Sequence, residues 1–74
     1  MKLKNRIREL RFQNGEMSQQ ALADAVDVTR MTIYSIEKEK FVPSALLAFR
    51  IARAFGVDIN DVFHLEDEQD GGEK

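Results

Sequence analysis

Apolar residues recur along this chain at intervals of three and four, the spacing that places side chains on one face of an α-helix. Five segments show this pattern. The first contains Leu3, Ile7 and Leu10 and is stopped by Asn14-Gly15. Because none of the segments shows the alternation of apolar and polar residues typical of a strand, the pattern predicts an all-α fold of five helices.

Polar residues between the apolar segments predict where the later helices begin and end. Ser, Thr and Asp side chains can accept the free N–H groups of a first helical turn, and Gly or Asp can adopt the left-handed conformation that follows a last turn. The predicted starts are Ser18, Thr29, Pro43-Ser44 and Asp58, and the predicted ends are Asp27-Val28 and Gly56.

The third segment carries a polar face opposite its apolar residues. Because Ile33 and Ile36 must face the core, the residues on the other side point outward, namely Arg30, Met31, Tyr34, Ser35 and Lys38. Such a face is often only solvated, and a methionine such as Met31 can also fill a gap in a core. This segment alone therefore leaves open whether its face binds anything.

The net charge of −2 averages two different parts of the 74-residue chain. Basic residues outnumber acidic ones up to Lys40, and acidic residues dominate from Phe41 onward. The acidic balance of the whole chain therefore does not exclude a nucleic-acid partner. Residues 66–74 combine acids with Gly71 and Gly72, so we expect a flexible acidic tail after a single domain of residues 1–65.

Several classes of protein are disfavoured by what the sequence contains. No apolar run approaches the ~20 residues of a bilayer span, and the charged start is unlike a signal peptide, so we expect a cytoplasmic protein. We find no Gly-rich phosphate loop, activated nucleophile or acid–base pair, and we expect no enzymatic activity, cofactor or small-molecule ligand. His64 stands alone and "DEQDGGE" lacks the ligand spacing of a calcium loop, so we expect no metal site.

Three stretches, "IRELR", "SQQALADAVDVTRMTIYSIEK" and "PSALLAFRIARAFGVDINDVF", resemble the small stand-alone regulators of the Cro/CI (Xre) family. The likeness covers residues 5–63, and its individually weak signals occur in the right order. It implies a five-helix lambda-repressor-like domain whose second and third helices form a helix-turn-helix. Such a regulator places its third helix in the major groove of double-stranded DNA, so we expect a sequence-specific transcriptional regulator, acting as a repressor.

The resemblance assigns roles to the polar residues of this region. The expected base-reading residues are Arg30, Met31, Tyr34 and Ser35. The expected phosphate-binding residues are Gln19, Gln20, Thr29, Thr32, Lys38 and Lys40. The family also commonly pairs an arginine late in its first helix with a glutamate near the end of its third, which here are Arg11 and Glu37. We expect this partly buried ion pair to hold the third helix at its angle.

Two departures from the family pattern concern turns. Asp27 stands where the turn between the second and third helices usually has Gly, and Glu39 stands where the third helix usually ends in Gly. Asp tolerates the left-handed conformation and Glu does so poorly. We therefore expect a normal turn at Asp27 and a strained or altered end of the third helix at Glu39.

One recognition helix contacts too few base pairs to find a site in a genome, so we expect a homodimer on a palindromic operator. The expected interface is Ile59, Val62, Phe63 and Leu65, with residues 63–66 extended against the N-terminus. Leu46 and Phe49 form a second candidate patch on the outer side of the fourth helix. The alternative is that Phe63 and Leu65 simply close the core.

A function from another class also fits the fold. The same helices could form a protein–protein adaptor or an antitoxin-like module that binds a protein partner, because a fold does not fix a function. Salt-sensitive binding to duplex DNA distinguishes a regulator from such a module.

Overall fold

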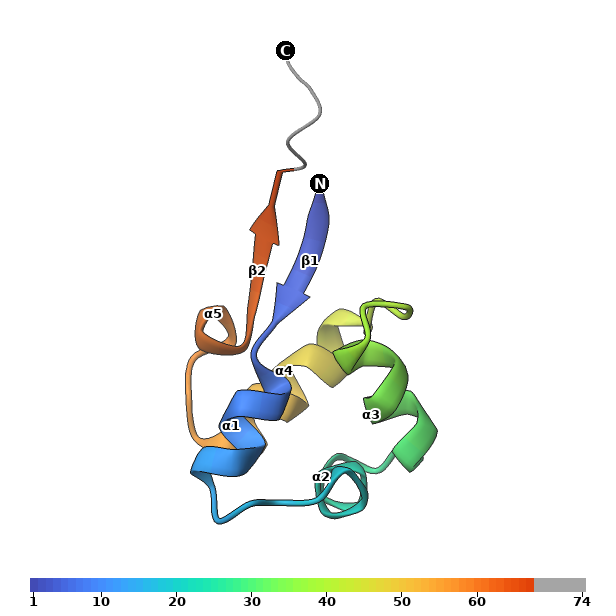
Figure 1. Cartoon of the computed structure of the whole chain (residues 1–74), viewed down its shortest axis with the longest axis vertical. Coiled ribbons are helices and arrows are strands. Elements are labelled where there is room, and N and C mark those ends of the chain that lie inside the picture. The colour runs from blue at the N-terminus through green and yellow to red at the C-terminus, as the bar shows by residue number, and fades with distance from the viewer. Residues whose placement is uncertain (68–74) are drawn as a thin grey trace.

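The computed structural model describes residues 1–67, as a helical body from which a two-stranded ribbon projects (Figure 1). The elements are β1 (Lys2–Asn5), α1 (Ile7–Gln13), α2 (Gln19–Val26), α3 (Arg30–Glu37), α4 (Ala45–Phe55), α5 (Ile59–Val62) and β2 (Phe63–Glu66). The five predicted helices are therefore confirmed. Among the described residues, no helix is both long and apolar enough to span a membrane.

The predicted starts of four helices are confirmed by hydrogen bonds. The Ser18, Thr29 and Ser44 hydroxyls accept the backbone N–H groups of Ala21, Thr32 and Leu47 at 2.9, 3.3 and 3.1 Å. Asp58 accepts the N–H of Asn60 and donates its own N–H to Asp61, which completes a capping box at α5. These caps satisfy N–H groups that have no partner inside a helix, so they fix where each helix begins.

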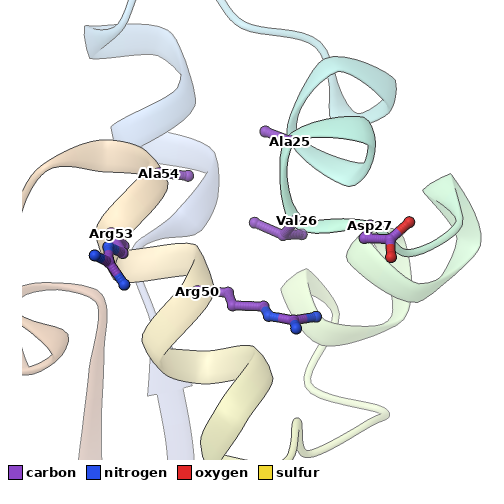
Figure 2. Close-up of a pocket in the computed structure, with 6 residues that line it drawn as sticks. All are labelled: Ala25, Val26, Asp27, Arg50, Arg53 and Ala54. Atoms are coloured by element: carbon purple, nitrogen blue, oxygen red, sulfur yellow. The ribbon is translucent and has the colours of Figure 1, made fainter.

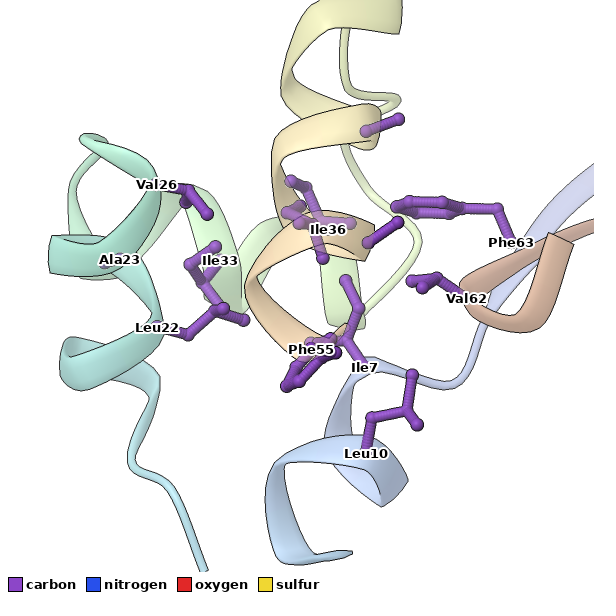
Figure 3. Close-up of a cluster of buried hydrophobic side chains, with 13 residues drawn as sticks. Ile7, Leu10, Leu22, Ala23, Val26, Ile33, Ile36, Phe55, Val62 and Phe63 are labelled. Carbon is purple, nitrogen blue, oxygen red and sulfur yellow. The ribbon is translucent and has the colours of Figure 1, made fainter. Parts of the chain in front are cut away.

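The apolar faces of all five helices meet in one core (Figure 3). Its largest fully buried side chains are Ile7, Leu22, Ile33, Ile36, Ile51 and Val62. Because Ile33 and Ile36 are both buried, α3 can rotate little about its axis, and the opposite face of α3 is held outward.

The ribbon was not predicted as a sheet. Leu3 lies in β1, where it pairs with Leu65 in an antiparallel register that also pairs Lys2 with Glu66, so its assignment to the first helix was wrong. The Arg6 N–H donates to the Val62 carbonyl at 2.8 Å, and the Asn5 amide donates to the Ile36 carbonyl at 2.9 Å. These bonds hold the chain extended up to α1. The expected extension of residues 63–66 against the N-terminus is confirmed.

Two further expectations about the end of the domain need correction. Val62 and Phe63 are 0% and 6% exposed and point into the core, so they cannot form a dimer surface. Phe63 closes the core, as the alternative proposed, whereas Leu65 is 64% exposed and Ile59 packs against the core while partly buried. Glu66, which was expected to begin the flexible tail, is the last residue of β2. Residues 68–74 of the predicted tail lie outside the described residues.

Candidate nucleic-acid interface

Helices α2 and α3 are joined by a tight turn at Asp27. Asp27 has a φ of 64° and a ψ of 47°, in the left-handed region, and its N–H donates to carbonyls of the last turn of α2. The next N–H, of Val28, donates to the Ala23 carbonyl at 3.0 Å. The turn is therefore regular although it lacks glycine, as expected for an aspartate, and it positions α3 across α2.

The outer face of α3 consists of the five residues opposite its buried isoleucines, namely Arg30, Met31, Tyr34, Ser35 and Lys38. Arg30, Met31 and Lys38 are exposed, while Tyr34 and Ser35 are partly buried. Met31 is 57% exposed, which excludes the alternative that it fills a gap in the core. The Lys38 ammonium lies 5.8 Å from the centre of the Tyr34 ring, a cation–π distance. The outer face therefore offers a guanidinium, an ammonium, two hydroxyls and one apolar side chain.

A shallow hollow beside α3 brings together predicted base-reading and phosphate-binding residues. It is lined by Thr29, Met31, Thr32, Ser35, Lys40 and Phe41. The Thr29 and Thr32 hydroxyls lie 3.1 Å apart at the start of α3. Phe41 is half-exposed and was not among the predicted residues. Its position directly after Lys40 could have indicated it, because aromatic and basic side chains occur together at nucleic-acid interfaces.

The two glutamines at the start of α2 have different environments. The Gln20 amide donates to the Asp24 carboxylate on the same helix at 2.9 Å, and both side chains are exposed. The Gln19 amide instead donates to Glu37 at 3.1 Å, on α3. The Gln19 side chain is therefore held against the neighbouring helix, whereas the Gln20 amide bonds within its own helix.

Arg11 and Glu37 form a bidentate ion pair between α1 and α3. The Arg11 Nε and Nη2 atoms donate to the two Glu37 carboxylate oxygens at 2.7 and 3.1 Å, and the two side chains are only 9% and 8% exposed. Arg11 also donates to the Met17 carbonyl at 2.7 Å. The structure thus brings together the pair that the resemblance implied, and adds Gln19 to it, which no sequence signal indicated.

The end of α3 is strained where the family usually has glycine. Glu39 has a φ of 64°, a conformation that a glutamate rarely adopts. Its carboxylate accepts a hydrogen bond from Lys4 at 3.3 Å and lies 3.8 Å from the Lys2 ammonium. Lys4 also lies 3.8 Å from Glu66. The strained residue therefore connects the ribbon to α3.

At the start of α1, an arginine and a glutamate shift each other's pKa. The carboxyl of Glu9 has its pKa lowered by a hydrogen bond from the Arg6 guanidinium and by the charge of that group, and the pKa of Arg6 is raised by the same contacts. The Arg6 and Glu9 side chains are 43% and 56% exposed, so the pair is screened by solvent and has little effect on stability.

A second hollow lies between the end of α2 and α4, away from the outer face of α3 (Figure 2). Ala25, Val26 and Ala54 form its apolar wall, and the Arg50 side chain extends across it toward the α2–α3 turn. Among the described residues, no cluster of His, Cys, Asp and Glu is suited to hold a metal ion.

Comparison with known proteins agrees with this geometry. The helix-turn-helix family model matches residues 7–62. The chain is 48% identical to YgzD of Bacillus subtilis, an uncharacterized HTH-type transcriptional regulator, over 89% of this chain and 98% of that protein. It is 46% and 43% identical to uncharacterized HTH-type transcriptional regulators of Archaeoglobus fulgidus and Methanocaldococcus jannaschii, over 90% of this chain and 94% and 100% of theirs. The chain therefore belongs to the Cro/CI (Xre)-type helix-turn-helix family, and it is a DNA-binding transcriptional regulator and not an enzyme.

Proposed function

We propose that this regulator binds double-stranded DNA sequence-specifically, with α3 in the major groove, as a homodimer on a palindromic operator, and that it represses transcription by occupying that operator. The observation that carries the proposal is the outer face of α3, where exposed polar groups stand opposite two fully packed isoleucines. A helix fits the major groove, and base recognition needs such a face on a helix whose orientation is fixed.

The residues of this face have different roles. The Arg30 guanidinium can donate two hydrogen bonds to one guanine, and the exposed Met31 can pack against a thymine methyl group. Tyr34 and Ser35 can bond to the edges of neighbouring bases. Further hydroxyl and ammonium groups around them can bind phosphate oxygens. They belong to Thr29, Thr32, Lys38 and Lys40.

Selection of bound sequences from a random duplex pool tests this proposal and yields the half-site. On the selected site, we expect Arg30→Ala to relax the preference at one base pair, at a cost of ~1–3 kcal/mol. The matched variant Lys40→Ala should weaken binding to all duplexes about equally and lower the salt dependence, since it removes a phosphate contact. Unchanged base preference after Arg30→Ala would contradict the assigned base-reading role. If no duplex binds at low salt and a protein partner is captured, the chain is an adaptor.

The dimer surface must differ from the one first expected, because Val62 and Phe63 are buried. Ile59 instead lines a hollow between α4 and α5, together with Leu46, Phe49 and Val57. Leu46 and Phe49 are 62% and 59% exposed. We therefore place the two-fold contact at this α4–α5 hollow, which unites parts of both candidate patches. Its rim carries Arg50, Arg53 and Asp58, charges of both signs that can pair across a two-fold axis.

Removal of residues 67–74 should tighten non-specific DNA binding at low salt. This segment contains four acids and one lysine, so it repels phosphate. Because it follows β2, the melting temperature should not change. Fluorescence anisotropy with a random duplex measures the affinity, and a neutral Gly/Ser tail of equal length separates charge from bulk. A large fall in melting temperature would show that the segment packs against the domain.

A further inference from the structure

Glu39 has a side chain that its backbone position does not require. The residue closes the turn after α3 in a left-handed conformation, with a φ of 64°. Its N–H donates to the Ile36 carbonyl at 2.9 Å. The next N–H, of Lys40, donates to the Ser35 carbonyl at 2.9 Å. A glycine would form the same two bonds without strain, so the strained glutamate indicates a role for its carboxylate.

The Glu39 carboxylate pairs with two lysines of the ribbon. The Lys4 ammonium donates to Glu39 Oε1 at 3.3 Å, and the Lys2 ammonium lies 3.8 Å from the same oxygen. The Lys4 and Glu39 side chains are 31% and 28% exposed, so solvent and salt screen this pair less than a fully exposed one. Lys4 also lies 3.8 Å from Glu66, whose side chain is 59% exposed. Within residues 1–67, Glu39 is therefore the acidic residue that pairs with both ribbon lysines.

The same turn borders the proposed phosphate contacts. Lys38 and Lys40 directly precede and follow Glu39 in the chain. Phe41 lines one hollow with Lys2 and Glu39, and it lines another with Lys40 and residues of the outer face of α3. The ribbon lysines therefore lie beside one end of the candidate interface. A lysine side chain is long and flexible, so its ammonium group can turn from a carboxylate toward a phosphate.

We propose that Glu39 limits the sequence-independent part of DNA binding, by holding the ammonium groups of Lys2 and Lys4 away from DNA phosphates. The inference rests on the proposed docking of α3 in the major groove. Each ammonium group that binds a phosphate releases counterions from the DNA and strengthens binding to every duplex alike. Glu39 opposes this, because each lysine must give up its ion pair before it binds a phosphate. The regulator therefore dissociates from random DNA more readily than its number of lysines suggests.

Removal of the carboxylate should make DNA binding stronger and more dependent on salt. The variants are Glu39→Gln, which keeps the backbone strain, and Glu39→Gly, which relieves it. Fluorescence anisotropy gives the affinity for a random duplex at about 50 and 200 mM salt. Because Lys2 and Lys4 become available for one or two further phosphate contacts, both variants should lose about 3–12-fold more affinity between these concentrations than the wild type. Discrimination between the selected operator and the random duplex should not change, since phosphate contacts carry no sequence information.

Glu16→Gln is the matched control for loss of one strained glutamate. Glu16 also has a left-handed φ, of 57°, and within residues 1–67 it forms no ion pair. This variant should leave the salt dependence unchanged, because it frees no lysine. In a background that carries Lys2→Gln and Lys4→Gln, Glu39→Gln should likewise not increase the salt dependence. Glu39→Gly has the residue that the family usually carries at this position, so the test does not depend on a variant that fails to fold.

The outcomes separate the inference from the proposed function. If the wild type binds duplex DNA and Glu39→Gln leaves the salt dependence unchanged, the carboxylate only anchors the ribbon, and the inference fails while the proposed function stands. If Glu39→Gly alters binding and Glu39→Gln does not, backbone strain is the cause, and the inference also fails. Altered discrimination at constant salt dependence would instead assign Glu39 a role in the orientation of α3. If the wild type binds no duplex at low salt, the inference and the proposed function both fail.

Discussion

Replacement of Phe49 by aspartate is expected to convert a dimer into a folded monomer and to weaken binding to the full operator by ~10²–10⁴-fold. Phe49 is exposed on α4, so the change leaves the core intact. Residues near a two-fold axis meet their own copies, so an aspartate there is repelled by its partner. The affinity falls because a monomer brings one α3 to the operator, whereas a dimer brings two that bind together.

Sedimentation velocity measures the assembly, and titration of full and half operators measures the affinity. On an isolated half-site, Phe49→Asp should bind as the wild type does, since the outer face of α3 is unchanged. Leu65→Asp is the companion variant, because Leu65 is similarly exposed but lies on the ribbon. A monomer after Leu65→Asp and a dimer after Phe49→Asp would move the interface to the ribbon. A wild type that stays monomeric at micromolar concentration with its operator would contradict the homodimer.

Arg11→Ala is expected to lower the free energy of unfolding by ~3–5 kcal/mol, because it leaves the Glu37 carboxylate nearly buried without its partner. A domain of this size has a total stability of roughly 5–15 kcal/mol, so the variant should be close to unfolding. Urea denaturation followed by circular dichroism gives the change as a shift in midpoint at constant slope. The double replacement Arg11→Met with Glu37→Leu should restore much of the stability, since it removes both charges.

Glu9→Ala provides the control, because it breaks an arginine–glutamate pair that lies on the surface. Its effect should be far smaller. The pKa of the Glu9 carboxyl is lowered in the folded state, so its contribution is present above the unfolded pKa and is lost as the pH falls through the folded one. An Arg11→Ala variant no less stable than Glu9→Ala would show that the buried pair does not hold α1 and α3 together.

The helices could be predicted because their signals are local. Ser18, Thr29, Ser44 and Asp58 cap the turns that directly follow them, and the apolar spacing of each segment already defines its buried face. The orientation of α3 followed from Ile33 and Ile36 alone. The strain at Glu39 was also foreseeable, because the family pattern requires a left-handed residue there.

The ribbon and the dimer surface depend on contacts between distant parts of the chain. "KLKN" contains a single apolar residue, and the spacing from Leu3 to Ile7 and Leu10 mimics a helical face. Only the pairing with residues 63–66 makes it a strand. The sequence likewise does not indicate which of the apolar residues from Ile59 to Leu65 are buried in the core. The hydrogen bond from Gln19 to Glu37 also joins two different helices, and no spacing within one helix predicts it.

The ribbon has a consequence for how the protein is made, because it pairs the first strand with the last described one. At a translation rate of about 5–20 residues per second, β2 leaves the ribosome roughly 3–12 seconds after β1. During that time residues 2–5 have no partner strand, and unpaired backbone groups of this kind can pair with other chains. Lys2 and Lys4 place two positive charges on this strand before Glu39 and Glu66 exist to neutralise them. Charged side chains on an unpaired segment disfavour its pairing with other chains, so we expect Lys2 and Lys4 to oppose aggregation of the unfinished chain as well as to anchor the finished ribbon.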